Sequence, residues 1–378
     1  MTTALDPISS NGQQSQNLSS SNGFKPTHAE EIHSRSIYEA SSQYRHWRFS
    51  AERLKNIRET LNQAAVAVIR SAFENDEVIL LSYHLRQPGS SQAISFLTAS
   101  EEYSLVKHYI TKVTQLCGHF RFSEEVEATA VSYLKRFYLK NTVMDWHPKN
   151  VMLTALFLAL KTTNNAISLD EFTSHIPKTS PADVLDLEFL VAQSLAFEFA
   201  VWHAHRALWG FRLDTQELPD APVSELDPIF ETAATFIRAS RLTDAELIYT
   251  PSQIALAALW SAAPQLALAW ASSKGQSESL TQVLSNIKAI VDSEGVGLEV
   301  ETVRVIDKRL RICKNPEKVK GSKAWLKKQQ EAEEKAKIKR IKKAEDARKA
   351  MEDDPFGGEL LAESQEKPAT VIDEDDDD

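Results

Sequence analysis

Two segments of this chain begin at a proline and continue with apolar residues on nearly every face, and they constrain its fold most strongly. The segments are Pro148–Leu160 and Pro251–Ala263, and both contain alanines. Proline fits the first turn of a helix, and a helix that is apolar all round must be surrounded by other helices. Small side chains allow those neighbours to approach closely. Each segment is therefore predicted to be the central helix of its own bundle.

The two prolines lie about 100 residues apart, which predicts two helical bundles in tandem. Amphipathic helices are expected before both central helices, because apolar residues recur there at the helical period. These residues are Val126, Ala130, Tyr133 and Phe137 before the first, and Ile229, Ala233, Phe236 and Ile237 before the second. Capping signals at Ser168 and Ser180 predict two more helix starts, and a third at Thr250 marks the start of the second central helix. With only 11 glycines and long stretches without hairpin signals, the chain is predicted to be all-α.

The chain outside the two bundles divides by composition. Residues 1–35 are rich in Ser, Asn, Gln and Thr, so they cannot offset the entropy of ordering. After Ser50, which can cap a helix, apolar residues recur at spacings of three and four. The predicted organisation is a disordered tail (1–35), an N-terminal helix and connection (36–96), the first bundle (97–202), the second bundle (203–313), a long basic helical extension (314–350) and an acidic disordered tail (351–378).

The formal net charge of −10 conceals two oppositely charged blocks near the C-terminus. Residues 314–349 hold 14 basic and 6 acidic side chains, whereas residues 351–378 hold 12 acidic and one basic. Residues 36–313, which include the N-terminal helix and both bundles, hold 26 basic and 32 acidic side chains. Direct nucleic-acid binding by this folded part is therefore not expected. The basic run Lys335–Lys343 is either a nuclear import signal or a solvated helix face.

Catalytic, cofactor and metal sites are not predicted. The sequence contains no nucleophile elbow, glycine-rich phosphate loop or kinase catalytic signature. His203 and His205 are expected to diverge on a helix, and no cysteine or carboxylate cluster completes a metal site around them. Cys117 and Cys313 are expected to be free thiols of an intracellular protein, and no apolar stretch has the length of a membrane span.

Three stretches of the sequence carry a family resemblance: Ser41–Phe49, Tyr133–Lys161 and Leu242–Leu256. They resemble the cyclin family, in particular its cyclin H type. Tyr133–Pro148, running on to Lys161, is similar to the second and third helices of a cyclin box. Leu242–Leu256 resembles the matching segment of the second box in cyclin H, and Ser41–Phe49 resembles the start of cyclin H. The resemblance extends to about Cys313 and implies two tandem five-helix cyclin boxes.

The resemblance also implies a kinase-binding site in the first box. Cyclins use a Lys at the end of the third helix and a Glu in the fifth, which correspond here to Lys161 and Glu188. Apolar contacts are implied for Leu158, Thr162, Phe197 and Phe199, although Thr162 is smaller and more polar than the usual residue. Phe137 and Phe157 are expected in the core. The helix around Tyr103–Ile110 lacks the substrate-docking patch of cell-cycle cyclins, so docking there is not expected.

The function implied is that of a non-enzymatic, nuclear regulatory subunit. It would bind and activate a cyclin-dependent kinase of the CDK-activating type, with a RING-finger assembly factor and the TFIIH core as further partners. It would support phosphorylation of the RNA polymerase II C-terminal domain and of kinase activation loops. The alternative is a TFIIB-type scaffold with two cyclin folds that contacts promoter DNA, which predicts a basic face and an N-terminal zinc ribbon. A cyclin-like elongation subunit shares the fold and would differ in its kinase.

Overall fold

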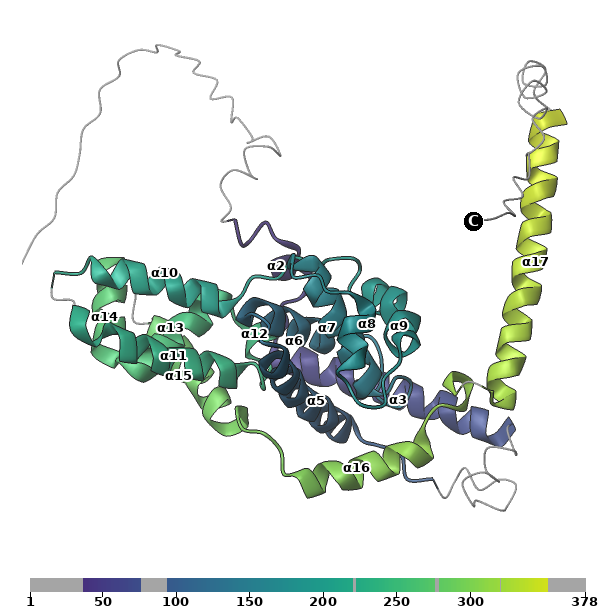
Figure 1. Cartoon of the computed structure of the whole chain (residues 1–378), viewed down its shortest axis with the longest axis horizontal. Coiled ribbons are helices and arrows are strands. Elements are labelled where there is room, and N and C mark those ends of the chain that lie inside the picture. The colour runs from purple at the N-terminus through teal and green to yellow at the C-terminus, as the bar shows by residue number, and fades with distance from the viewer. Residues whose placement is uncertain (1–36, 76–93, 220–221, 276–278, 320, 353–378) are drawn as a thin grey trace, which may run out of the picture.

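A computed structural model describes residues 37–75, 94–219, 222–275, 279–319 and 321–352. Every regular element within these ranges is helical, which confirms the all-α prediction. The helices form two bundles side by side, with a long helix projecting from one end (Figure 1). The predicted disorder of residues 1–35 and of almost all of 351–378 lies outside the described residues.

The first bundle consists of five helices. They are α5 (Ala99–Phe120), α6 (Glu124–Phe137), α7 (Pro148–Thr162), α8 (Leu169–Ser174) and α9 (Pro181–Ser194). Helix α7 is buried continuously from Val151 to Leu160 and contacts α5, α6 and α9, so it is the central helix that its composition predicts. Phe137 and Phe157 are buried in this core, as expected.

The second bundle repeats the arrangement. It contains α10 (Ala204–Gln216), α11 (Leu226–Ser240), α13 (Pro251–Ala262), α14 (Pro264–Ser273) and α15 (Ser279–Glu294), with the short α12 (Ala245–Ile248) before its central helix. Helix α13 is buried from Ile254 to Leu259 and contacts α10, α11, α14 and α15. The Thr250 hydroxyl accepts from the Gln253 amide at 3.2 Å, and the Gln253 side chain accepts from the Thr250 amide at 3.0 Å, so the capping prediction is confirmed here.

Further helices precede and follow the two bundles in the chain and pack against them. Helices α2 (Ser42–His46) and α3 (Ala51–Asn75) precede the first bundle, and Ser50 accepts from the Arg53 amide at 3.2 Å as the predicted cap. Helix α16 (Val300–Cys313) lies within 203–313, the range expected for the second bundle, but its apolar face packs against the first core and α5. The short η3 (Pro316–Lys318) contacts both α3 and the last helix.

Helix α17 (Lys323–Glu352) is the projecting helix in Figure 1, and its side chains are exposed from Leu326 to Lys349. Cys117 and Cys313 are free and buried, and burial raises the pKa of these thiols to about 12 and about 11, respectively. Among the described helices, none combines the length and the apolar character that a membrane span requires.

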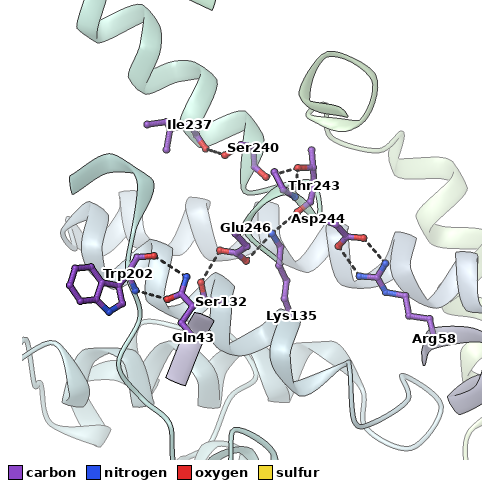
Figure 2. A network of polar contacts seen from close by, with 11 residues as sticks. Gln43, Arg58, Ser132, Lys135, Trp202, Ile237, Ser240, Thr243, Asp244 and Glu246 are labelled. Carbon is purple, nitrogen blue, oxygen red and sulfur yellow. Dashed lines mark hydrogen bonds and ion pairs between the residues drawn. The ribbon is translucent and has the colours of Figure 1, made fainter. Parts of the chain in front are cut away.

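A polar seam joins the two bundles, whose apolar cores are separate clusters (Figure 2). Lys135, on α6, donates to the Thr243 carbonyl at 2.6 Å and pairs with Glu246 at 3.0 Å. Arg58, on α3, binds both carboxylate oxygens of Asp244 at 2.6 and 2.7 Å. The segment that follows Leu242 therefore links the second bundle to the first and to the N-terminal helix.

Candidate functional site

Lys161 and Glu188 meet on the surface of the first bundle and form an ion pair. Lys161 is the first exposed side chain after the buried run of α7, and Glu188 lies on α9, which packs beside α7. The Thr154 hydroxyl donates to the Val184 carbonyl at 3.0 Å and ties the two helices together below the pair. The Lys161 ammonium also lies 4.8 Å from the centre of the Phe157 ring, a cation–π contact that orients it.

Large apolar side chains surround this pair in the described structure. Leu185 and Phe189, on α9, and Phe197, just after it, are all exposed; the exposed fractions are 71% for Phe189 and 55% for Phe197. We call the surface formed by Lys161, Leu185, Glu188, Phe189 and Phe197 the α7–α9 face. A soluble protein that gathers exposed aromatic side chains around a charged pair presents the composition of a protein-binding surface.

The backbone that carries Phe197 is unusual. Ala196 and Phe197 both have left-handed backbone angles, with φ of 54° and 59°. Such angles in residues other than glycine are strained and gather at functional sites. The Phe197 ring lies 6.1 Å from that of Phe189 and 6.3 Å from that of Phe199. The left-handed turn therefore brings the segment back toward α9 and places the rings of Phe189, Phe197 and Phe199 next to one another.

The six side chains implied by the resemblance fall into two groups. Lys161, Glu188 and Phe197 face outward, and the structure brings them together. Leu158 is only 6% exposed and belongs to the core, while Phe199 is half-buried.

Thr162 turns its hydroxyl inward, where it donates to the helix carbonyls of Leu158 and Ala159 at 3.1 and 3.2 Å. The Tyr133 hydroxyl lies 3.0 Å from the same oxygen and donates to the Phe199 carbonyl at 2.7 Å. Thr162 and Tyr133 therefore tie the end of α7 to the segment that carries the aromatic rings.

Leu185 and Phe189 were not predicted from the sequence. The helical period of α9 contains the signal, because Val184, Val191 and Leu195 form its buried stripe and Leu185 and Phe189 fall outside it. A large apolar pair at i and i+4, away from the core stripe and beside Glu188, marks a second apolar face on the helix.

The prediction that His203 and His205 diverge is wrong. Their rings stack with centroids 5.2 Å apart. His203 is the N-cap of α10 and has an extended backbone, so helical spacing does not apply to this pair. Burial lowers the pKa of His203 well below its usual value, with a further contribution from His205. No group of three or more potential metal ligands forms among the described residues.

Comparison with known proteins gives two family matches. The cyclin N-terminal domain family matches residues 90–200, and the cyclin C-terminal domain family matches residues 203–293. The chain is 30% identical to the cyclin mcs2 of Schizosaccharomyces pombe, over 84% of this chain and 97% of that protein.

Two solved structures contain similar chains. A chain in the structure of the CAK complex from Chaetomium thermophilum bound to ATP-gamma-S has a TM-score of 0.67 and 30% identity, covering 82% of this chain and 96% of that one. A chain in the yeast TFIIK complex (Kin28/Ccl1/Tfb3) has a TM-score of 0.55 and 30% identity, covering 67% of this chain and all of that one.

Proposed function

This chain belongs to the cyclin family, in its cyclin H branch, and we propose that it binds and activates a cyclin-dependent kinase of the CDK-activating type. As a cyclin it is a non-catalytic regulatory subunit. The observation that carries the proposal is the α7–α9 face, where an exposed Lys161–Glu188 pair lies among exposed aromatic side chains. The similar chains in the CAK and TFIIK complexes support it, because both complexes are kinase assemblies.

The proposed interface uses Lys161 and Glu188 as its polar centre and the aromatic side chains as its rim. Both charged side chains keep partial access to solvent, 41% and 26%, so a partner can still contact them. Phe197 is proposed to contact the kinase directly. Half-buried Phe199 and exposed Thr162 contribute through their accessible parts, and buried Leu158 supports the end of α7 from within.

The mechanism is allosteric. A protein kinase is active only when its β3 Lys pairs with a Glu on its αC helix and its magnesium-binding loop is in place. A rigid partner that binds the active position of αC more tightly than the inactive one shifts the population toward activity by that difference in affinity. Continuous burial of α7, which lies directly beneath the face, supplies the rigidity.

The wider assembly is part of the proposal. The yeast TFIIK complex holds a kinase, a cyclin and the third subunit Tfb3. By this similarity the chain would work in the nucleus with its kinase and a RING-finger assembly factor, attached to the TFIIH core. Its kinase would phosphorylate the RNA polymerase II C-terminal domain and the activation loops of other kinases.

The test is reconstitution of the full chain with the purified kinase, measuring affinity by titration and activity on a C-terminal domain peptide. Lys161→Ala with Glu188→Ala is expected to weaken kinase binding by about 2 to 5 kcal/mol, because the kinase groups that these two side chains are proposed to contact are left desolvated without partners. The control is Lys288→Ala with Asp292→Ala, an exposed pair on α15 with an N–O distance of 2.7 Å, which is expected to behave as wild type. Equal affinity and activation for both double variants would contradict the proposal.

A further inference from the structure

The segment that carries Phe197 is held in place by the N-terminal part of the chain, which precedes both cyclin boxes. The Glu198 carboxylate accepts from the Trp47 indole N–H at 2.6 Å. Its other oxygen lies 2.5 Å from Nδ1 of His46. Both carboxylate oxygens of Glu198, the residue after Phe197, are therefore bound by side chains more than 150 positions earlier in the chain.

Trp47 is itself fixed. It is buried, and two cations contact its ring, the Arg136 guanidinium at 5.0 Å and the Lys140 ammonium at 4.9 Å from the ring centre. The same Arg136, which is also buried, donates to the Glu198 carbonyl at 3.3 Å. Glu198 is thus fixed through its side chain and its backbone by groups that contact one another.

Gln43 holds the far end of the same segment. Its side-chain amide accepts from the Trp202 amide at 2.6 Å and donates to the Trp202 carbonyl at 3.2 Å (Figure 2). Gln43 is buried, and a side chain that satisfies both backbone groups of one residue fixes that residue's orientation.

The segment needs such support because its backbone is strained. The left-handed angles at Ala196 and Phe197 are unfavourable for residues with a Cβ, and they persist only where the surrounding structure over-determines them. Helix α9 fixes the segment at one end, through the hydrogen bond from the Phe197 amide to the Ala192 carbonyl at 3.0 Å. Beyond the turn, the segment is held at Glu198 by Trp47, at the Phe199 carbonyl by the Tyr133 hydroxyl, and at Trp202 by Gln43.

We propose that Gln43 and Trp47 are positioning residues for kinase binding, which act through Trp202 and Glu198 to hold Phe197 in its place on the α7–α9 face. This inference rests on the proposed function. It makes the shape of the kinase-binding face depend on a segment outside both boxes. Loss of these hydrogen bonds frees the left-handed turn to relax without exposing the core of the first box.

The first test measures hydrogen exchange in the free, full-length chain. In Glu198→Ala, the amides of Phe197 and Glu198 are expected to exchange at least about tenfold faster, since a charge-assisted hydrogen bond is lost. In Gln43→Ala, the amide of Trp202 is expected to exchange faster by the same factor, since its hydrogen-bond acceptor is removed. Glu198→Gln is the rescue variant, because its amide oxygen can still accept from Trp47 and its amide N–H can donate to His46. Glu301→Ala, in an exposed pair with Arg304 on α16, is the matched control.

The second test measures affinity for the kinase with the same variants. Glu198→Ala is expected to bind about tenfold more weakly, whereas Glu198→Gln and Glu301→Ala stay within about twofold of wild type. Trp47→Phe keeps an aromatic ring beside Arg136 and Lys140 but removes the N–H donor. Its affinity for the kinase is therefore expected to fall, as in Glu198→Ala.

Two results would overturn the inference. One is unchanged exchange of these amides in Glu198→Ala and Gln43→Ala, and the other is faster exchange with kinase affinity equal to wild type. A wild-type chain that does not bind the kinase would contradict the proposed function instead. The exchange comparison in the free chain would then still decide whether Glu198 holds the segment.

Discussion

Two of the Lys–Glu pairs in the described structure, Lys135–Glu246 and Lys161–Glu188, lie in contrasting surroundings. At the seam, the Lys135 side chain is 1% exposed and Glu246 is 23% exposed; on the α7–α9 face, Lys161 and Glu188 are 41% and 26% exposed. Lys135 also donates to the Thr243 carbonyl, and Glu246 accepts from the Ser132 hydroxyl at 2.8 Å. The seam pair is therefore completed by the chain itself, whereas the other pair lies open among exposed aromatic side chains.

This difference shows that residue type alone does not decide whether an ion pair contributes to folding stability or to binding. An ion pair buried within a folded chain is costly to break, because removal of one partner leaves the other charge desolvated. The pair on the α7–α9 face contributes little to folding, since water already solvates the exposed lysine. The two glutamates are similarly exposed, so the pairs differ in the lysine, which is buried only at the seam. We expect the seam pair to affect stability and the pair on the α7–α9 face to affect binding.

The largest expected effect is that of Lys135→Ala on stability. The substitution removes the cation beside Glu246 and leaves the Thr243 carbonyl without its donor, so the free energy of unfolding is expected to fall by about 3 to 5 kcal/mol. Chemical denaturation of the full chain measures this change, with exposed Lys288→Ala as the control. A loss below about 1 kcal/mol would mean that the two pairs do not differ in the way described.

Lys161→Ala is expected to have the opposite effect, with a large loss of kinase affinity and little loss of stability. Kinase affinity falls by about 2 to 5 kcal/mol, because the complex buries a Glu188 that has lost its partner. The free energy of unfolding changes by at most about 1 kcal/mol. The same variant serves both measurements, and a loss of stability as large as that of Lys135→Ala would show that the surface pair is structural.

Glu102 extends the comparison to a buried carboxyl group with which no cation of the described residues forms an ion pair. It accepts hydrogen bonds from the Val143 amide at 2.9 Å and from Asn62 at 2.7 Å, yet burial raises its pKa to about 7 from 4.5. The folded chain therefore binds more protons than the unfolded chain between these pH values, so this contribution to stability is complete below pH 4.5 and is lost as the pH rises through 7.

The loss across this window is about 3 kcal/mol. Unfolding measured between pH 4.5 and pH 8 is expected to show a downward slope in wild type and a flatter profile in Glu102→Gln, which cannot ionise. Identical slopes in the two proteins would assign the pH dependence to other groups.

Phe189→Ala is expected to have the smallest effect of the set. Truncating this exposed ring is expected to weaken kinase binding by about 1 to 2 kcal/mol, while stability stays within about 0.5 kcal/mol of wild type. Titration against the kinase measures the first quantity and thermal unfolding the second. Wild-type affinity would remove Phe189 from the proposed interface and leave its charged centre intact.

Local patterns in the sequence predicted the helices, and the family resemblance indicated the two residues of the charged pair. Proline and the apolar run placed α7 and α13, and the reciprocal hydrogen bonds of Thr250 follow from residues only three apart. Lys161 and Glu188 were identified by resemblance, and their pairing depends on how α7 and α9 pack.

The contacts that sequence reasoning missed join residues far apart in the chain. Arg58 meets Asp244, and α16 packs against α5, because of tertiary packing that no local period records. The stacked histidines were missed for a different reason: His203 caps α10 with extended backbone, so spacing rules for helical residues do not apply to it.

Hydrogen exchange of the full chain with and without its kinase tests the central claim most directly. The account predicts added protection at the end of α7 and through α9 to Phe199, with the amides of the seam around Thr243 and Glu246 unchanged. Protection confined to α10, α14 or α17, with the α7–α9 face exchanging as in the free chain, would contradict it.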